Sequence, residues 1–182
     1  INAGQAPVQE TDLAETIARN TDRITATMSH EEAVHNSDIS FVIVPTPSDE
    51  KGAFSLQYAQ WAFAEIGKAL RTKDGYHVIV LTSTVLPGST RYGLMPFLEK
   101  ESRKVCGKDF GLCYSPEFIA LGSVIRDLTN ADFYLLGEFD QASGDRAAEV
   151  YTQVSKNKGP IRRMNIENAE LAKISLNSFV TL

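Results

Sequence analysis

Apolar residues gather in short runs that are separated by longer segments with helical spacing. Unbroken runs suit strands buried on both faces of a sheet, because such strands have no polar side to show. Six stretches are predicted as strands: 23–27 (RITAT), 39–44 (ISFVIV), 77–81 (HVIVL), 110–115 (FGLCYS), 132–138 (DFYLLGE) and 160–165 (PIRRMN).

Helical spacing fills most of the intervals between these strands. Helices are predicted at 11–20, 29–34, 55–73, 91–102, 140–154 and 167–179, with a helical turn inside 116–128. Thr11 or Asp12 is expected to cap the first helix, and Ser29 with Glu32 forms a capping box for the second. Pro96 should start or kink the fourth. Buried strands alternating with helices predict an α/β fold with a mostly parallel sheet.

The composition is typical of a globular domain and argues against nucleic-acid and membrane-surface partners. The chain has 182 residues, 43% hydrophobic and 23% charged, with a formal net charge of −5. Nucleic-acid and membrane-surface partners are not expected, because phosphate binding leaves a basic footprint and no block of Lys and Arg is present. No apolar run is long enough to span a bilayer and no signal peptide is visible, so a cytoplasmic protein is predicted.

The two cysteines, Cys106 and Cys113, lack His or Cys partners at metal-ligand spacing. They fit reduced thiols of a cytosolic protein. A catalytic thiol is the alternative, although Cys113 lies in an apolar run, where cysteines are generally inert.

Three loops follow directly after predicted buried strands. In open α/β sheets ligands bind beyond the carboxyl ends of the strands, which is where 44–48 (VPTPS), 82–88 (TSTVLPG) and 115–122 (SPEFIALG) begin. Proline stiffens the first loop, so Thr46 and Ser48 are either held in a defined geometry for a ligand or form an ordinary turn.

The other two loops also allow two interpretations. Ser83 and Thr84 offer hydroxyls to a ligand or cap the next helix. Glu117, between a proline and an aromatic residue, has either a raised pKa and a role as a base, or a carboxylate that accepts backbone N–H groups.

The helix at 167–179 (ENAELAKISLNSF) places Glu170, Lys173 and Asn177 on one face. Such a group usually forms the solvated side of a surface helix. The alternative is an oxyanion site, because an ammonium and a carboxamide one turn apart can stabilise negative charge that develops on a substrate oxygen.

Four motifs in this order, FVIVPTP, STVLPGST, SPEFIALGS with a later RDL, and ENAELAKISLNSF, resemble the UDP-glucose/GDP-mannose dehydrogenases. The opening INAGQAPVQETDLAE resembles the stretch after that family's second strand. The resemblance runs over essentially the whole chain.

The resemblance implies a Rossmann NAD-binding domain, a central helix and a nucleotide-sugar domain. Family members oxidise the 6-hydroxyl of a UDP- or GDP-sugar to a carboxylate in two NAD-dependent hydride transfers, through a cysteine thiohemiacetal and thioester. Residues 1–164 are expected to be a partial Rossmann-like domain, and 165–182 the start of the central helix, which builds a homodimer in the family.

The same resemblance assigns roles to site residues. Thr84 contacts NAD and helps to hold the catalytic water, Glu117 is the acid/base, and Lys173 with Asn177 stabilises the oxyanion and orients the water. The loop residues Thr46, Pro47, Ser48 and Ser83 border the cofactor together with Thr84. The sugar nucleotide is expected to lie along Glu117, Phe118, Ile119, Ala120 and Leu121, with Lys173 and Asn177 also at the substrate.

The sequence departs from the family pattern in three ways. It has no G-x-G-x-x-G loop, which grips the pyrophosphate in Rossmann folds. Neither of its cysteines matches the family's nucleophile. Leu121 replaces the second Glu of the PEFLxEG motif, which ordinarily touches the cofactor, so cofactor contact or substrate choice should differ. A fragment of a longer enzyme is predicted, inactive by itself. Its missing first two strands would lie between 23–27 and 39–44, so the edge of a central strand should be exposed.

Two alternatives stay open from the sequence. A β-hydroxyacid or 6-phosphogluconate-type dehydrogenase also carries Lys and Asn four residues apart on the helix after its Rossmann domain, but lacks PEF and VPTP at these positions. A catalytically inactive remnant or oligomerisation module would keep the fold and bind neither NAD nor a sugar nucleotide.

Overall fold

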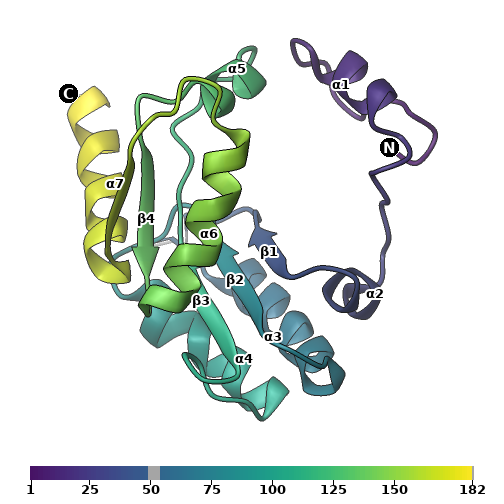
Figure 1. Ribbon diagram of the computed structural model, residues 1–182. Coiled ribbons are helices and arrows are strands. Elements are labelled where there is room, and N and C mark those ends of the chain that lie inside the picture. The colour runs from purple at the N-terminus through teal and green to yellow at the C-terminus, as the bar shows by residue number, and fades with distance from the viewer. Residues whose placement is uncertain (49–53, 182) are drawn as a thin grey trace.

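The computed structural model describes residues 1–48 and 54–181 (Figure 1). Its strands are β1 (Ile39–Val42), β2 (His77–Leu81), β3 (Phe110–Tyr114), β4 (Tyr134–Glu138) and β5 (Ile161–Asn165). The helices are α1 (Leu13–Arg19), α2 (His30–His35), α3 (Gln57–Thr72), the π-helical η1 (Ser89–Leu94), α4 (Met95–Ser102), α5 (Val124–Thr129), α6 (Gln141–Val154) and α7 (Ile166–Thr181).

The five strands form one sheet in the order β1-β2-β3-β4-β5. All neighbouring strands are parallel except β3 and β4, which pair antiparallel through Cys113 with Glu138 and Tyr114 with Gly137. The α/β class and the mostly parallel sheet are therefore confirmed. Because β4 overlaps only the carboxyl end of β3, its first residues extend past that end and flank the loop that follows β3.

Helices cover both faces of the sheet and create two apolar layers. On one face, α3, α4 and α7 pack over side chains such as Ile79, Leu112 and Leu135. On the other, α6 packs over Val78, Val80 and their neighbours, in front of the sheet in Figure 1. Burial of both faces accounts for the unbroken apolar runs in β2 and β3, all of whose residues are buried.

Helix α7 lies unusually close to β4 because Gly137 has no side chain. A Cβ at this glycine would come within 2.8 Å of the Ala169 Cβ and 2.9 Å of the Ile166 Cα. The helix starts directly after β5 and passes Gly137 before its Lys173 reaches Glu117 in the loop after β3. It therefore runs toward the edge of the sheet where the three predicted ligand loops begin.

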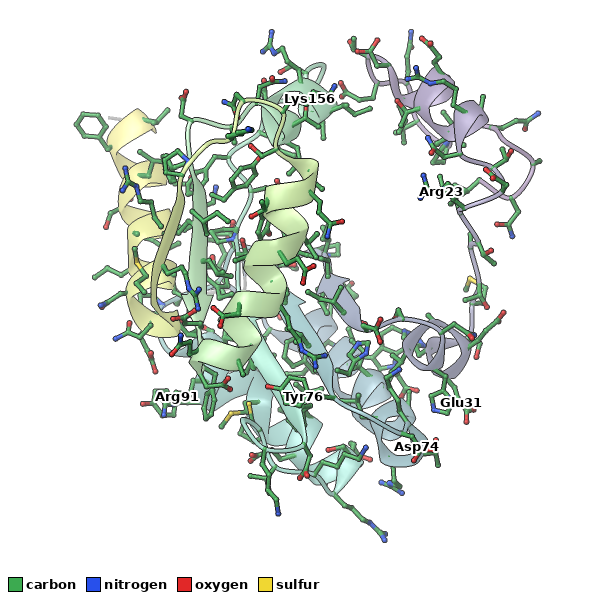
Figure 2. The ribbon with its side chains drawn as sticks, viewed as in Figure 1. Arg23, Glu31, Asp74, Tyr76, Arg91 and Lys156 are labelled. Atoms are coloured by element: carbon green, nitrogen blue, oxygen red, sulfur yellow. The ribbon has the colours of Figure 1, made fainter. Side chains whose placement is uncertain are left out.

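The strand predicted at 23–27 is wrong. These residues form an extended connection between α1 and α2, which Figure 2 shows at Arg23, and they pair with no described strand. A cavity of about 570 Å³ separates this connection from β1. Strand propensity alone does not make a strand, because the backbone needs a hydrogen-bonding neighbour.

The helix ends differ in detail from the predictions. Ser29 caps α2 by accepting from the Glu32 N–H at 3.1 Å, as expected, but the Glu32 carboxylate accepts from Thr27 instead of completing the capping box. Asp12 makes no side-chain cap on α1, and the Thr11 hydroxyl bonds elsewhere. Pro96 lies in the first turn of α4, where its missing N–H costs nothing. No helix among the described residues is long and apolar enough to cross a membrane.

Candidate active site at the carboxyl edge of the sheet

The loops after β1 and β2 are bonded directly to each other. The Ser83 hydroxyl accepts from the Val44 N–H at 2.8 Å and donates to the Val44 carbonyl at 2.7 Å. The Thr46 hydroxyl donates to the Thr84 carbonyl at 2.8 Å. Hydroxyls that were candidates for ligand contact therefore first hold two backbone segments side by side, and Thr46, Ser83 and Thr84 lie close together.

Pro47 and Ser48 are both exposed at the outer end of this layer. The Pro47 carbonyl accepts from the Ser55 N–H at 2.8 Å, and Ser48 forms an isolated bridge with Phe54. The chain on either side of residues 49–53 is thus held together. Its tip, 49–53, lies outside the described residues.

Lys173 on α7 reaches the loop after β3. Its side chain is buried, its Nζ donates to the Glu117 carbonyl at 2.6 Å, and the ammonium lies 4.4 Å from the centre of the Phe118 ring. A cation over an aromatic face is attracted by the ring quadrupole. The interpretation of Lys173 as part of a solvated helix face is therefore wrong.

Burial shifts the pKa values of Glu117 and Lys173 in opposite directions. It raises the pKa of the Glu117 carboxyl, while the nearby Lys173 ammonium opposes the rise. It lowers the pKa of Lys173, while Glu117 opposes the fall. Each group is thus closer to exchanging its proton near neutral pH than it would be in water, which suits acid–base chemistry.

The remaining predicted substrate residues are open to solvent. Asn177 lies one turn after Lys173 on α7 and is exposed, as are Ile119, Ala120 and Leu121. The Leu121 side chain is 95% exposed. The site therefore has a buried inner part at Lys173 and an uncovered outer part at 119–121.

Two carboxylates that the sequence reasoning did not assign to the site hold its loops. Glu170, fully buried, accepts from the Gly88 N–H at 2.5 Å and the Thr90 N–H at 2.8 Å. Its signal in the sequence was a carboxylate on the same helix face as Lys173.

Glu10 lies far from this edge in sequence. Its carboxylate accepts from the Gly122 N–H at 2.7 Å and the Val124 N–H at 3.3 Å, and the Thr11 hydroxyl donates to the Gly122 carbonyl at 2.8 Å. The segment around α1 thereby braces the end of the exposed 119–122 stretch. No local pattern in the sequence predicts a contact across more than a hundred positions.

Both cysteines are buried, and burial raises the pKa of each thiol to about 12. Because the thiolate is the nucleophile, Cys106 and Cys113 are structural at neutral pH. Among the described residues no cluster of three or more His, Cys, Asp or Glu could hold a metal ion.

The layer formed by the loops after β1 and β2 fits one side of a dinucleotide. Thr46 and Thr84 are only partly buried, so each keeps accessible surface beyond the carboxyl ends of β1 and β2, where doubly wound folds bind their cofactors. A glycine-rich pyrophosphate loop is not part of this sequence. The residues present would therefore hold NAD from one side.

Residues 1–155 match the UDP-glucose/GDP-mannose dehydrogenase family, NAD binding domain. The chain belongs to this family. The resemblance predicted from the motifs and the NAD cofactor are thereby confirmed.

Individual relatives agree with this assignment. GDP-mannose 6-dehydrogenase of Pseudomonas aeruginosa is 36% identical over 179 residues, which are 97% of this chain and 40% of the relative. UDP-glucose 6-dehydrogenase AglM of Haloferax volcanii is 32% identical over 99% of this chain and 42% of its own length. The chain thus spans about two fifths of the length of the curated relatives it matches.

Solved structures show the same relationship in three dimensions. A ternary complex of GDP-mannose dehydrogenase from Pseudomonas aeruginosa superposes with a TM-score of 0.92 at 35% identity, covering 99% of this chain and 41% of that one. A 3-hydroxyisobutyrate dehydrogenase from Mycobacterium tuberculosis reaches a TM-score of 0.61 at 16% identity, covering 93% of this chain and 49% of that one. The latter likeness, to a protein of the alternative dehydrogenase class, shows a shared fold alone.

Proposed function

We propose that this chain is the NAD-binding part of an enzyme that oxidises the 6-hydroxyl of a nucleotide sugar to a carboxylate in two hydride transfers. The observation that carries the proposal is the Lys173 ammonium, buried on α7 and 2.6 Å from the Glu117 carbonyl. At the same edge of the sheet lie the Glu117 carboxyl, whose pKa is raised by burial, and the loops after β1 and β2.

The chemistry needs these groups at different stages. Loss of the hydroxyl proton and of a hydride from C6 gives an aldehyde, to which a cysteine thiol adds as a thiohemiacetal. Loss of a second proton and hydride gives the thioester, and water hydrolyses it to the carboxylate and the free thiol. NAD, when bound, supplies the hydride acceptor. Lys173 and Asn177 stabilise negative charge on the C6 oxygen, because preorganised donors in a partly dry site strongly favour an oxyanion.

Glu117 serves as the acid/base, since burial raises the pKa of its carboxyl and so brings its proton exchange closer to neutral pH. Thr84 helps to hold the hydrolytic water and contacts NAD together with Thr46, Pro47, Ser48 and Ser83. The nucleophilic cysteine of the family is neither Cys106 nor Cys113, because both thiols are buried with raised pKa values.

GDP-mannose is the first substrate to test. The relatives named GDP-mannose 6-dehydrogenase are 36–37% identical to this chain, against 32% and 30% for two relatives named UDP-glucose 6-dehydrogenase. The sugar nucleotide is proposed to lie along 117–121. We also propose a cytoplasmic homodimer that contains α7 in its central helix, without nucleic-acid or membrane partners.

The test is NADH formation by the complete gene product that contains these residues, measured with GDP-mannose, UDP-glucose and other UDP- and GDP-sugars. Two NADH per uronate are expected with one of them. The 182-residue chain alone should give no NADH. A complete gene product that reduces NAD with none of these sugars, or with 3-hydroxyacids instead, contradicts the proposal.

A further inference from the structure

Glu170 is a buried carboxylate that the proposed chemistry does not use. It is fully buried, and no ion pair among the described residues neutralises it. Lys173, three residues further along α7, donates to the Glu117 carbonyl. Burying a charge without a counter-ion is costly unless strong hydrogen bonds replace water, so the bonds that Glu170 makes decide its role.

Those bonds go to the start of a helix. Gly88 and Thr90 lie at the beginning of the π-helical η1, which continues into α4, and their N–H groups belong to the first turn, where backbone donors lack partners inside the helix. A carboxylate satisfies such donors and favours the positive end of the helix dipole. Glu170 thus caps this helix from a distant part of the chain, 80 and 82 residues away.

The capped turn ends the loop that carries Thr84. The start of this loop is fixed by the Thr82 N–H, which donates to the Val42 carbonyl at 2.9 Å, and its middle by the Thr46 hydroxyl on the Thr84 carbonyl. Its end turns at Gly88, whose φ of +86° strains any other residue. The Glu170 carboxylate fixes this turn by accepting from the Gly88 N–H.

We propose that Glu170 is a positioning residue for the cofactor: it fixes the turn at 88–90 and thereby sets where Thr84 meets NAD. This inference rests on the proposed role of the 82–88 loop at the cofactor. Lys173 holds the loop after β3 from the same face of α7, so the helix sets both loops with two neighbouring side chains.

The test uses the complete gene product and two readouts. Hydrogen exchange of peptides covering 84–94, without ligand, reports the turn itself, and fluorescence titration with NADH reports cofactor affinity. In Glu170→Gln an NH2 group replaces one of the two acceptor oxygens and cannot accept from the Gly88 or Thr90 N–H, so exchange at 88–90 should accelerate and the Kd for NADH should rise about tenfold. The KM for the nucleotide sugar should change less than about twofold, because Lys173 keeps its contact.

A matched control is available on the same helix. Glu167 also reaches η1, but as a partly exposed ion pair with Arg91 at 3.5 Å; Figure 2 labels Arg91. Such pairs contribute little to stability. Glu167→Gln should therefore leave both the exchange of 84–94 and the NADH affinity at wild-type values.

Gly88→Ala disturbs the same contact from the side of the loop. It therefore provides a second test of the proposal if Glu170→Gln fails to fold. It should weaken NADH binding in the same way, and the double variant should bind no worse than the poorer single one. A folded Glu170→Gln or Gly88→Ala with wild-type NADH affinity overturns the proposal. So does a general rise in exchange with equal loss of NADH and sugar affinity, which indicates a structural role only.

The outcome is separable from that of the proposed function. A wild-type protein that binds NADH but oxidises no nucleotide sugar refutes the proposed reaction, whereas the exchange and NADH results still decide the role of Glu170. A wild-type protein that does not bind NADH overturns the positioning role as well.

Discussion

The loop after β2 and the loop after β3 carry the two sides of the proposed site, and they are held very differently. In the first, Thr82, Ser83 and Val85 are buried, and hydrogen bonds with β1, Thr46 and Glu170 fix its course. In the second, burial ends at Phe118, and the stretch 119–122 is exposed. The cofactor side is therefore preorganised by the chain itself, whereas the substrate side is anchored at its base and open beyond.

The largest effect is expected from loss of the anchor at the base of the open loop. In the complete gene product, Lys173→Met should lower kcat about a hundred- to a thousandfold, the usual loss for one oxyanion donor. The Kd for NADH should stay close to the wild-type value, because Lys173 contacts Glu117 and Phe118 in the loop after β3. Steady-state NADH formation and NADH titration check both. A variant that keeps at least half of its kcat contradicts the proposed role.

Shortening one apolar side chain in each loop compares how much the two loops contribute to the free energy of unfolding. Val85→Ala removes two methyl groups from a fully buried site and should lower the free energy of unfolding by about 2 kcal/mol. Leu121→Ala, at a side chain that is 95% exposed, should change it by less than about 0.5 kcal/mol. Denaturant titration of both variants is the measurement. Equal losses would show that the contrast between the loops is wrong.

Glu117→Gln should lower the activity and slightly raise the free energy of unfolding. Burial raises the pKa of Glu117, so the folded state binds more protons than the unfolded state, and wild-type stability falls as pH rises from the unfolded pKa through the folded one. Removing the charge should therefore stabilise the fold above this window, by up to about 0.5 kcal/mol because the side chain is only partly buried. Melting curves at pH 4 and pH 8 test the sign, and a greater gain at the lower pH would refute it.

The smallest effect is expected at the outer end of the open loop. Leu121→Glu restores the residue that the family motif ordinarily has, and a carboxylate there can accept hydrogen bonds from cofactor hydroxyls. Because the position is exposed, the gain should be small, with the KM for NAD lowered by no more than about threefold. Initial rates at varied NAD check this, and Leu121→Gln controls for the change in size. An increase in KM would indicate that Leu121 makes an apolar contact in the complete enzyme.

Hydrophobic patterning predicted the central strands well because burial on both faces leaves an unmistakable run, as at 77–81. It could not predict that β4 runs antiparallel to β3, since an apolar run has no direction. At 23–27 it predicted a strand where no described strand provides a partner. Strand pairing depends on the whole fold, so local strand propensity does not predict it.

The site shows the same division. Thr46, Ser83, Thr84, Glu117 and Lys173 could be predicted because motifs and strand ends mark them, and the structure brings them to one edge. The supporting carboxylates could not. Glu10 acts across a sequence separation of 112 residues, and Glu170 fits the solvated face of a surface helix by its spacing alone but accepts from backbone N–H groups. Contacts of this kind depend on the tertiary path of the chain.

Helix α7 contacts both loops through Glu170 and Lys173, one turn apart. A rigid element shared by two sites makes their binding free energies interdependent, and such dependence is reciprocal. Whatever factor NAD contributes to the affinity for the sugar nucleotide, the sugar nucleotide must contribute to the affinity for NAD. Because free energy is a state function, the order in which the two ligands bind cannot change the total free energy of filling the site, whatever coupling α7 provides.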